Sequence, residues 1–221
     1  MEKYEVSQTD AGLQINGFPD GVKVIALEGG RAKRLADLAL HKSDLQFANH
    51  CLEAINSTPE NPNILREALW RSAIVHFFKC FGDSGCRFQI SADTVLKGEG
   101  STAMLVFKYF KSLRNKHLVH DENSYSQSLP GAILNNGSKD YKIEKIVCFA
   151  TNAVTLMPEN YSNLKLLIDK GLMWVEKEFD VLCDSLTTEL ESLGYDDLMA
   201  RAPMRFQVPE EDDLHRRRLA P

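Results

Sequence analysis

The segment ALWRSAIVHFFKCF, Ala68–Phe81, is apolar on most of its sides. This apolar pattern is interrupted strongly only by Arg71, His76 and Lys79. A helix with so little polar surface is normally buried among neighbouring elements. Asn63, a residue type that favours the position before a helix, precedes it. The segment therefore predicts the central helix of a helical domain.

Helical periodicity continues on both sides of this segment. Apolar residues recur at spacings of three, four and seven over Arg31–Asn56, which predicts an amphipathic helix. A third long helix is expected to start near Ser101, after a short helix or capped loop over 90–100, and the longest is expected to run from Pro158 to just before Gly194. The fold class predicted is mainly α, with one helical domain over 31–198.

Two stretches show strand-like alternation. Residues 1–30 are expected to form an ordered N-terminal arm or two short strands, Gly12–Ile15 and Val22–Leu27, separated by a turn. Tyr141–Ala150 also alternates, and we expect Ala153–Met157 to pair back onto it as a hairpin. This predicts a small β insertion at about 136–157.

Composition limits the classes of function. With a formal charge of −5 over 221 residues, the chain is not expected to coat nucleic acid through bulk charge, although a local basic cleft is compatible with it. No apolar run approaches 18 residues and the N-terminus begins with polar residues, so we expect a cytoplasmic protein without a membrane partner. Residues 199–221 change from an acidic to a basic block, which predicts a flexible charged tail.

The motifs of several enzyme classes are missing from the sequence. The five cysteines form no C-x-x-C pair, and the six histidines form no H-E-x-x-H, so no metal site is predicted. The glycine-rich patterns of phosphate loops, dinucleotide folds and serine hydrolases are also missing. We therefore expect no cofactor.

The strongest candidate site is the stretch LRNKHLVHD, Leu113–Asp121, at the expected end of the third helix. Arg114 supplies a permanent planar cation that suits phosphate, and His120 supplies a side chain that changes protonation state near neutral pH. On an ideal helix the two would lie about 9 Å apart along the axis and about 120° apart around it. One copy of the chain is therefore not expected to complete a site. Further cations for phosphate are Lys108, Lys111 and Lys116.

Arg114, Asn115 and His120 together resemble the R-x(4–6)-H motif of HEPN domains, in which a polar residue commonly follows the arginine. The resemblance implies an up-and-down helical bundle, usually a homodimer, in which the arginine and histidine of both copies meet. Many such proteins are metal-independent endoribonucleases of toxin–antitoxin and antiphage systems. An RNA substrate, a second copy, and an antitoxin or regulatory protein are the partners that the resemblance implies.

The R-x(4–6)-H pattern occurs twice more, at Arg34–His41 and Arg71–His76, as is common for a short motif. Only the Arg114 copy lies where a long amphipathic helix runs out into polar sequence. The surrounding sequence therefore favours the Arg114 match over the other two as the functional site.

RNA carries its own nucleophile, the 2′-OH. A protein needs to align it, remove its proton, neutralise the phosphate and assist the leaving 5′ oxygen. We expect Arg114 and His120 to be the catalytic pair, Asn115 to support them, and His117 to be the rival proton-transfer residue. The alternatives are a non-catalytic HEPN-like dimer that binds a nucleotide, RNA or a protein, and a helical dimerisation protein whose charged helix end is only solvated.

Overall fold

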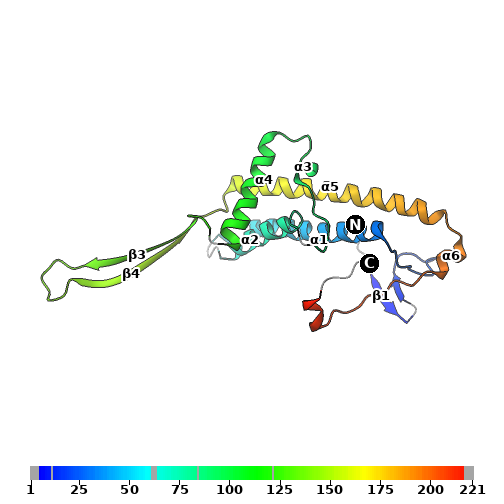
Figure 1. Ribbon diagram of the computed structural model, residues 1–221, viewed down its shortest axis with the longest axis horizontal. Helices are drawn as coiled ribbons and strands as arrows, with labels where there is room; N and C mark the ends of the chain where they lie inside the picture. Colours follow the sequence, from blue (N-terminus) through cyan, green and yellow to red (C-terminus); the bar gives the residue numbers. More distant parts are fainter. Residues whose placement is uncertain (1–4, 11, 61–63, 84, 121, 217–221) are drawn as a thin grey trace. The chain divides into compact units, whose positions relative to one another are not determined.

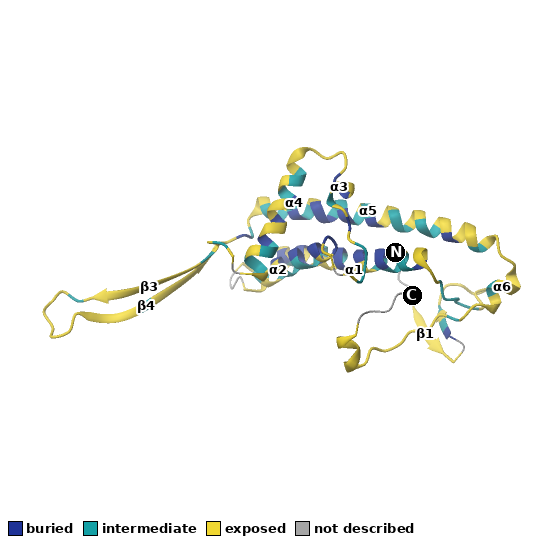
Figure 2. Cartoon of the chain, in the orientation of Figure 1, coloured by how far each residue is buried: buried dark blue, intermediate teal, exposed yellow. Residues whose placement is uncertain are grey.

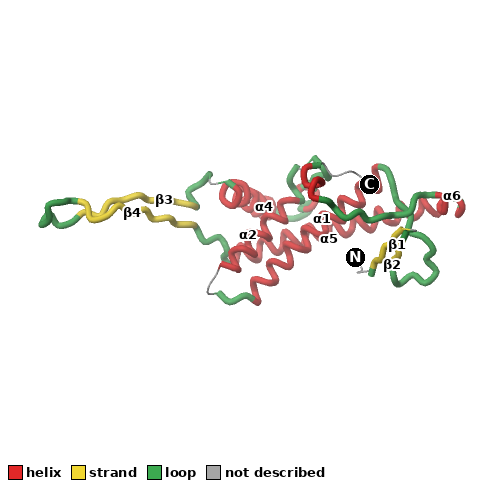
Figure 3. The backbone as a smooth tube through the Cα atoms, turned by 90° about the horizontal axis from the view of Figure 1, so that it is seen from below, coloured by secondary structure: helices red, strands yellow, loops and turns green. Residues whose placement is uncertain are grey.

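Helices dominate the computed structural model, which describes residues 5–10, 12–60, 64–83, 85–120 and 122–216 (Figures 1 and 3). The prediction of a mainly α protein is confirmed. The helices are α1 (Gly30–Ser57), α2 (Ile64–Lys79), α3 (Ala92–Val95), α4 (Ser101–Leu113), α5 (Pro158–Glu191) and α6 (Tyr195–Ala200), with a π-helical turn η1 (Arg114–Val119) and a 3₁₀ turn η2 (Glu211–His215). The predicted cap at Asn63 lies outside the described residues.

Two small antiparallel sheets complete the described elements. The first joins β1 (Val6–Thr9) to β2 (Gly12–Ile15), and the second joins β3 (Ser126–Leu134) to β4 (Ile143–Asn152).

The chain divides into two compact units. The first unit comprises 1–43, 83–89 and 173–221, and the second comprises 44–82 and 90–172. Each of the long helices α1 and α5 contributes to both. The domain boundaries at 31 and 198 stay a prediction.

The core of the second unit is built on α2, as the apolar sequence of that helix predicts. Its buried residues Trp70, Ala73, Ile74, Phe77 and Phe78 recur at spacings of three and four and so lie on one face of the helix. Their rings meet aromatic residues of α4, with centroid distances of 5.9 Å for Trp70–Phe110 and 5.2 Å for Phe78–Phe107. Aromatic burial of this kind contributes strongly to stability, so α4 is fixed against α2.

Leucine and isoleucine side chains of α1 and α5 supply the rest of this core. The fully buried ones in the second unit are Leu45, Leu52, Ile55, Leu164 and Ile168. Gly171 allows close approach, because a Cβ at that position would meet the Leu45 side chain at 3.3 Å.

In the first unit, the N-terminal arm differs from the prediction. Gly12–Ile15 is a strand as expected, but it pairs with Val6–Thr9, and residues 22–27 form no strand. Ile25 instead makes a single β-bridge with Pro203. The short strand expected at Val22–Leu27 is therefore absent, and the bridging partner of Ile25 comes from the far end of the sequence.

Residues 202–206 of the predicted tail are hydrogen-bonded to this arm. The Met204 amide donates to the Val24 carbonyl at 2.8 Å, and the Leu13 amide donates to the Met204 carbonyl at 3.0 Å. Flexibility of the tail beyond this segment stays a prediction.

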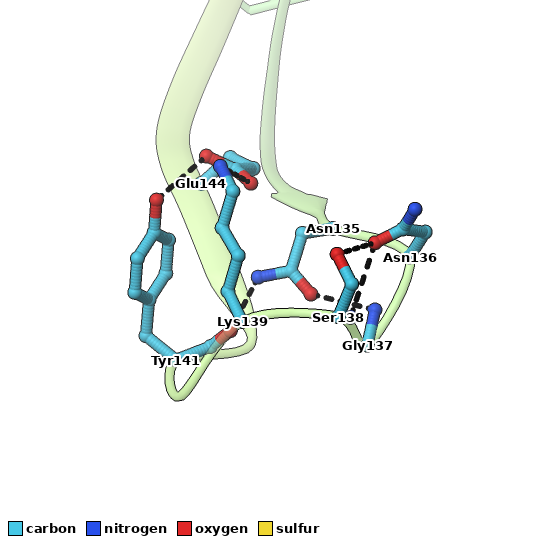
Figure 4. Close-up of polar contacts among 7 residues, drawn as sticks. All are labelled: Asn135, Asn136, Gly137, Ser138, Lys139, Tyr141 and Glu144. Carbon is cyan, nitrogen blue, oxygen red and sulfur yellow. Dashed lines mark hydrogen bonds and ion pairs between the residues drawn. The ribbon is translucent and has the colours of Figure 1, made fainter.

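The β insertion is present in the second unit, but its partner strand and its bounds differ from the prediction of about 136–157. Residues 143–152 are a strand, whereas their partner is Ser126–Leu134 and not Ala153–Met157. The connecting turn contains Asn135 and Asn136, whose side-chain oxygens accept the amides of Gly137 and Ser138 (Figure 4). The turn that closes the hairpin therefore precedes the strand Ile143–Asn152, whereas the prediction placed it after that strand.

Candidate functional site

Helix α4 presents its apolar face to the core and its cations to solvent. Phe107, Phe110 and Leu113 are buried, while Lys108 and Lys111 are exposed. On an α-helix these lysines are neighbours three residues apart. The helix thus delivers a basic surface up to the residue where the candidate motif begins.

At Arg114 the backbone changes from α-helix to a π-helical turn that ends at Val119. Such turns are rare in proteins overall, and those that are found often lie at functional sites. The turn is closed by the Glu122 amide, which donates to the Lys116 carbonyl at 2.9 Å. His120 follows in an extended conformation, with φ −124° and ψ 148°. The ideal-helix separation of Arg114 and His120 therefore does not apply, because His120 is not helical.

Arg114 is half-buried and incompletely paired. Its Nη1 donates to Asn115 Oδ1 at 2.8 Å, whereas its Nε is buried without a hydrogen-bond partner. Among the described residues it forms no ion pair with a carboxylate. A guanidinium attracts an anion most strongly when no fixed carboxylate already neutralises it, so this cation is suited to bind a phosphate.

The arginines of the two other arginine–histidine matches form ion pairs with carboxylates. Arg71 Nε lies 2.7 Å from Glu67 Oε1, and Arg34 Nη2 lies 3.2 Å from Glu178 Oε2. Both arginines are therefore neutralised by neighbouring carboxylates, unlike Arg114.

Their histidines are also held by other groups. His76 Nδ1 lies 2.8 Å from Asp44 Oδ1, and His41 is fully buried with Nε2 2.8 Å from the Phe88 carbonyl oxygen. These contacts fit structural roles for both histidines.

His117 and His120 occupy opposite environments. Both ring nitrogens of His117 are buried without a hydrogen-bond partner, and its ring lies edge-on to Tyr125 with a centroid distance of 5.5 Å. His120 is exposed, as is Lys116, and no described residue hydrogen-bonds to the His120 ring. A residue that transfers a proton to a substrate must reach it, so His120 has the accessible ring and His117 does not.

A network of polar side chains lies beside His117. Tyr109 of α4 accepts a hydrogen bond from Asn160 Nδ2 at 3.2 Å, and Asn160 also donates to the Thr155 carbonyl at 2.9 Å. Burial raises the pKa of the Tyr109 phenol; a hydrogen bond with Tyr125 raises it further, while Asn160 opposes the shift. The phenol therefore stays neutral well into the alkaline range.

This network continues into the core and to the base of the hairpin. Thr155 Oγ1 accepts the indole N–H of Trp70 at 3.0 Å, and the Ala153 amide donates to the Tyr125 carbonyl at 2.7 Å. The residues entering β3 and leaving β4 are thus fixed next to η1.

The structure brings some predicted site residues together and leaves others apart. Arg114 and Asn115 are in contact, whereas the described side chains show no hydrogen bond from either to His117 or His120. Tyr109, Tyr125 and Asn160 were not among the predicted site residues. No local spacing indicates them, because they come from a helix, a loop and another helix far apart in the chain.

Among the described residues, no cluster of three or more histidine, cysteine, aspartate or glutamate side chains could hold a metal ion. Within the same residues, no helix combines the length and apolar character that crossing a membrane requires. Comparison of the chain with protein-family models, with curated proteins and with solved structures finds no match.

Proposed function

We propose that this chain is a metal-independent endoribonuclease of toxin or antiphage-defence type. The observation that carries the proposal is the state of Arg114. Its guanidinium lies in a π-helical turn, has a buried Nε without a partner, and forms no ion pair with a described carboxylate. A cation held in this way is suited to the phosphate of RNA, and the exposed His120 follows six residues later.

The proposed reaction uses the 2′-OH of the RNA itself. The imidazole of His120 takes the 2′-hydroxyl proton, and the 2′ oxygen attacks the adjacent phosphorus. The bond from phosphorus to the 5′ oxygen breaks, and that oxygen takes up a proton, leaving a 2′,3′-cyclic phosphate and a 5′-hydroxyl. Arg114 stabilises the charge on the phosphate oxygens throughout.

The other named residues have supporting roles in this proposal. Asn115 orients the guanidinium through its 2.8 Å hydrogen bond, and Lys108, Lys111 and Lys116 attract the RNA backbone. His117 positions the turn by packing against Tyr125. A homodimer with a HEPN-like bundle would supply a second histidine as the acid for the leaving oxygen.

Cleavage of mixed RNA in excess EDTA tests this proposal. The purified chain is expected to cut RNA, and Arg114→Ala is expected to lower the rate by about 10²–10³-fold because the phosphate loses its fixed cation. Arg71→Ala is the matched control, since Arg71 also begins an R-x(4–6)-H match but is paired with Glu67.

Two results would contradict the proposal that this chain is an endoribonuclease. One is the absence of cleavage by the natural chain, and the other is an equal loss in both variants. RNA binding that depends on Arg114 without any cutting would favour the non-catalytic binding protein instead.

A further inference from the structure

The β3–β4 hairpin exposes almost all of its residues. Figure 2 shows both strands coloured as exposed along most of their length, and only Ser126 and Val147 are partly covered. An isolated two-stranded hairpin is only marginally stable in water, so this one is expected to gain a partner.

The exposed side chains are unusually apolar. Ile146 is 70% exposed and Phe149 is 62% exposed. The other large apolar side chains that the hairpin exposes are Leu129, Ile133, Leu134, Tyr141 and Ile143. A concentration of this kind on one element marks an interaction surface.

Charge argues against nucleic acid as the partner of the strands. Glu144 and Lys145 are the only charged residues of β3 and β4, and they cancel. At the turn, Lys139 Nζ is paired with Glu144 Oε1 at 2.6 Å (Figure 4). Over 126–152, three lysines (Lys139, Lys142 and Lys145) stand against Asp140 and Glu144, a net charge of +1. That single excess charge offers little attraction to a phosphate backbone and little repulsion to a second copy.

The two edges of the hairpin differ. Within the described residues its sheet has two strands, so each strand has an outer edge. In β3 that edge is interrupted by Pro130, which has no N–H and sits in strands with its nitrogen toward the unpaired side. The β4 edge has no proline and can pair with a further strand.

We propose that β4 pairs antiparallel with β4 of a second copy, about a two-fold axis near Val147 and Cys148. The pairing forms one four-stranded sheet with Phe149 of both copies on one face and Ile146 of both copies on the other. The same patch then contacts itself, as a two-fold interface requires. The pairing covers one strand edge and the side chains beside it, so the interface is at the small end of specific interfaces. A small interface of this kind is expected to form reversibly.

Sedimentation of the full chain over a concentration series tests this interface. The natural chain is expected to self-associate, and Phe149→Glu is expected to weaken a step of that association by about tenfold or more, because a carboxylate loses hydration in an apolar contact. A dimer formed by the helical bundle alone would not depend on Phe149, so an association that Phe149→Glu leaves unchanged would overturn the proposal. Thr151→Glu is the matched control, since it places the same charge on the same face of β4, and it is expected to change the constant by no more than about threefold.

Cross-linking through Cys148 provides a second test without altering the apolar surface. A short bismaleimide is expected to link two natural chains through the exposed Cys148, and Cys148→Ser is expected to abolish that product. A natural chain that is monomeric at about 100 μM, or a cross-link that does not depend on Cys148, would overturn the proposal. So would a monomer that sediments with phosphatidylcholine–phosphatidylserine vesicles, which would assign the hairpin to a membrane surface. Loss of RNA cleavage alone does not bear on it, because dimer mass is measured separately.

Discussion

Replacing His120 with alanine is expected to lower RNA cleavage by about 10²–10⁴-fold, the usual contribution of a general acid–base residue. The reason is access: the His120 ring is exposed directly after the π-helical turn that carries Arg114. Its substitution removes no buried contact, so the circular dichroism spectrum and the unfolding midpoint are expected to stay unchanged. The measurement is the single-turnover rate on one RNA in EDTA.

His117→Phe is the matched variant for this experiment. Phenylalanine keeps an aromatic ring against Tyr125 and removes two ring nitrogens that are buried without partners. A buried polar atom without a hydrogen bond costs about 1–3 kcal/mol, so the variant is expected to be as stable as the natural chain or more stable. It is also expected to retain cleavage within a few-fold. If His117→Phe abolishes cleavage while His120→Ala retains it, the assignment of the proton-transfer residue is wrong.

Phe110→Ala is expected to destabilise the protein by about 3–5 kcal/mol, the usual cost of deleting a buried phenylalanine. Phe110 is fully buried, and its ring lies 5.9 Å from Trp70 and 5.1 Å from Tyr109 between ring centroids. Removing it leaves a cavity directly beneath α4 and loosens the helix that carries the candidate motif. Urea unfolding followed by circular dichroism measures the effect.

Leu105→Ala is the control on the same helix, because Leu105 is 64% exposed. It is expected to change the free energy of unfolding by no more than about 0.5 kcal/mol. Equal destabilisation by the two variants would mean that α4 does not pack on α2 through Phe110.

The long helices were predictable because their apolar periodicity extends over many turns. Helix α1 was expected over Arg31–Asn56 and spans Gly30–Ser57, and α5 starts at Pro158 as expected. In such helices the core face repeats often enough to outweigh local exceptions. The central position of α2 followed from the same reasoning, since few of its residues are polar.

The strands were harder to predict because their partners are set by tertiary contacts. The strand β3 was not predicted because it contains Pro130 and Gly131, and proline and glycine are depleted in strands. With β3 unrecognised, the predicted partner of the strand was Ala153–Met157, which is wrong. In the arm, Ile25 bridges to Pro203, a partner 178 residues away that no local pattern reveals.

The candidate site was predictable only in part. The motif context singled out Arg114, and the structure shows that the arginines of the two rival copies are neutralised by Glu67 and Glu178. The π-helical turn was not predictable, because the residues from Arg114 to Val119 carry no recognised signal for it. Burial of His117 against Tyr125 depends on that turn, so it could not be anticipated either.

End-group analysis of the RNA products tests the central claim most directly. With the natural chain in excess EDTA, attack by the 2′-OH predicts 2′,3′-cyclic phosphate and 5′-hydroxyl ends, and a substrate with a single 2′-deoxy nucleotide at the cut position should resist cleavage there. Both features should disappear with Arg114→Ala. Products with 3′-hydroxyl and 5′-phosphate ends, or cyclic phosphate formed equally by Arg114→Ala, would contradict the account.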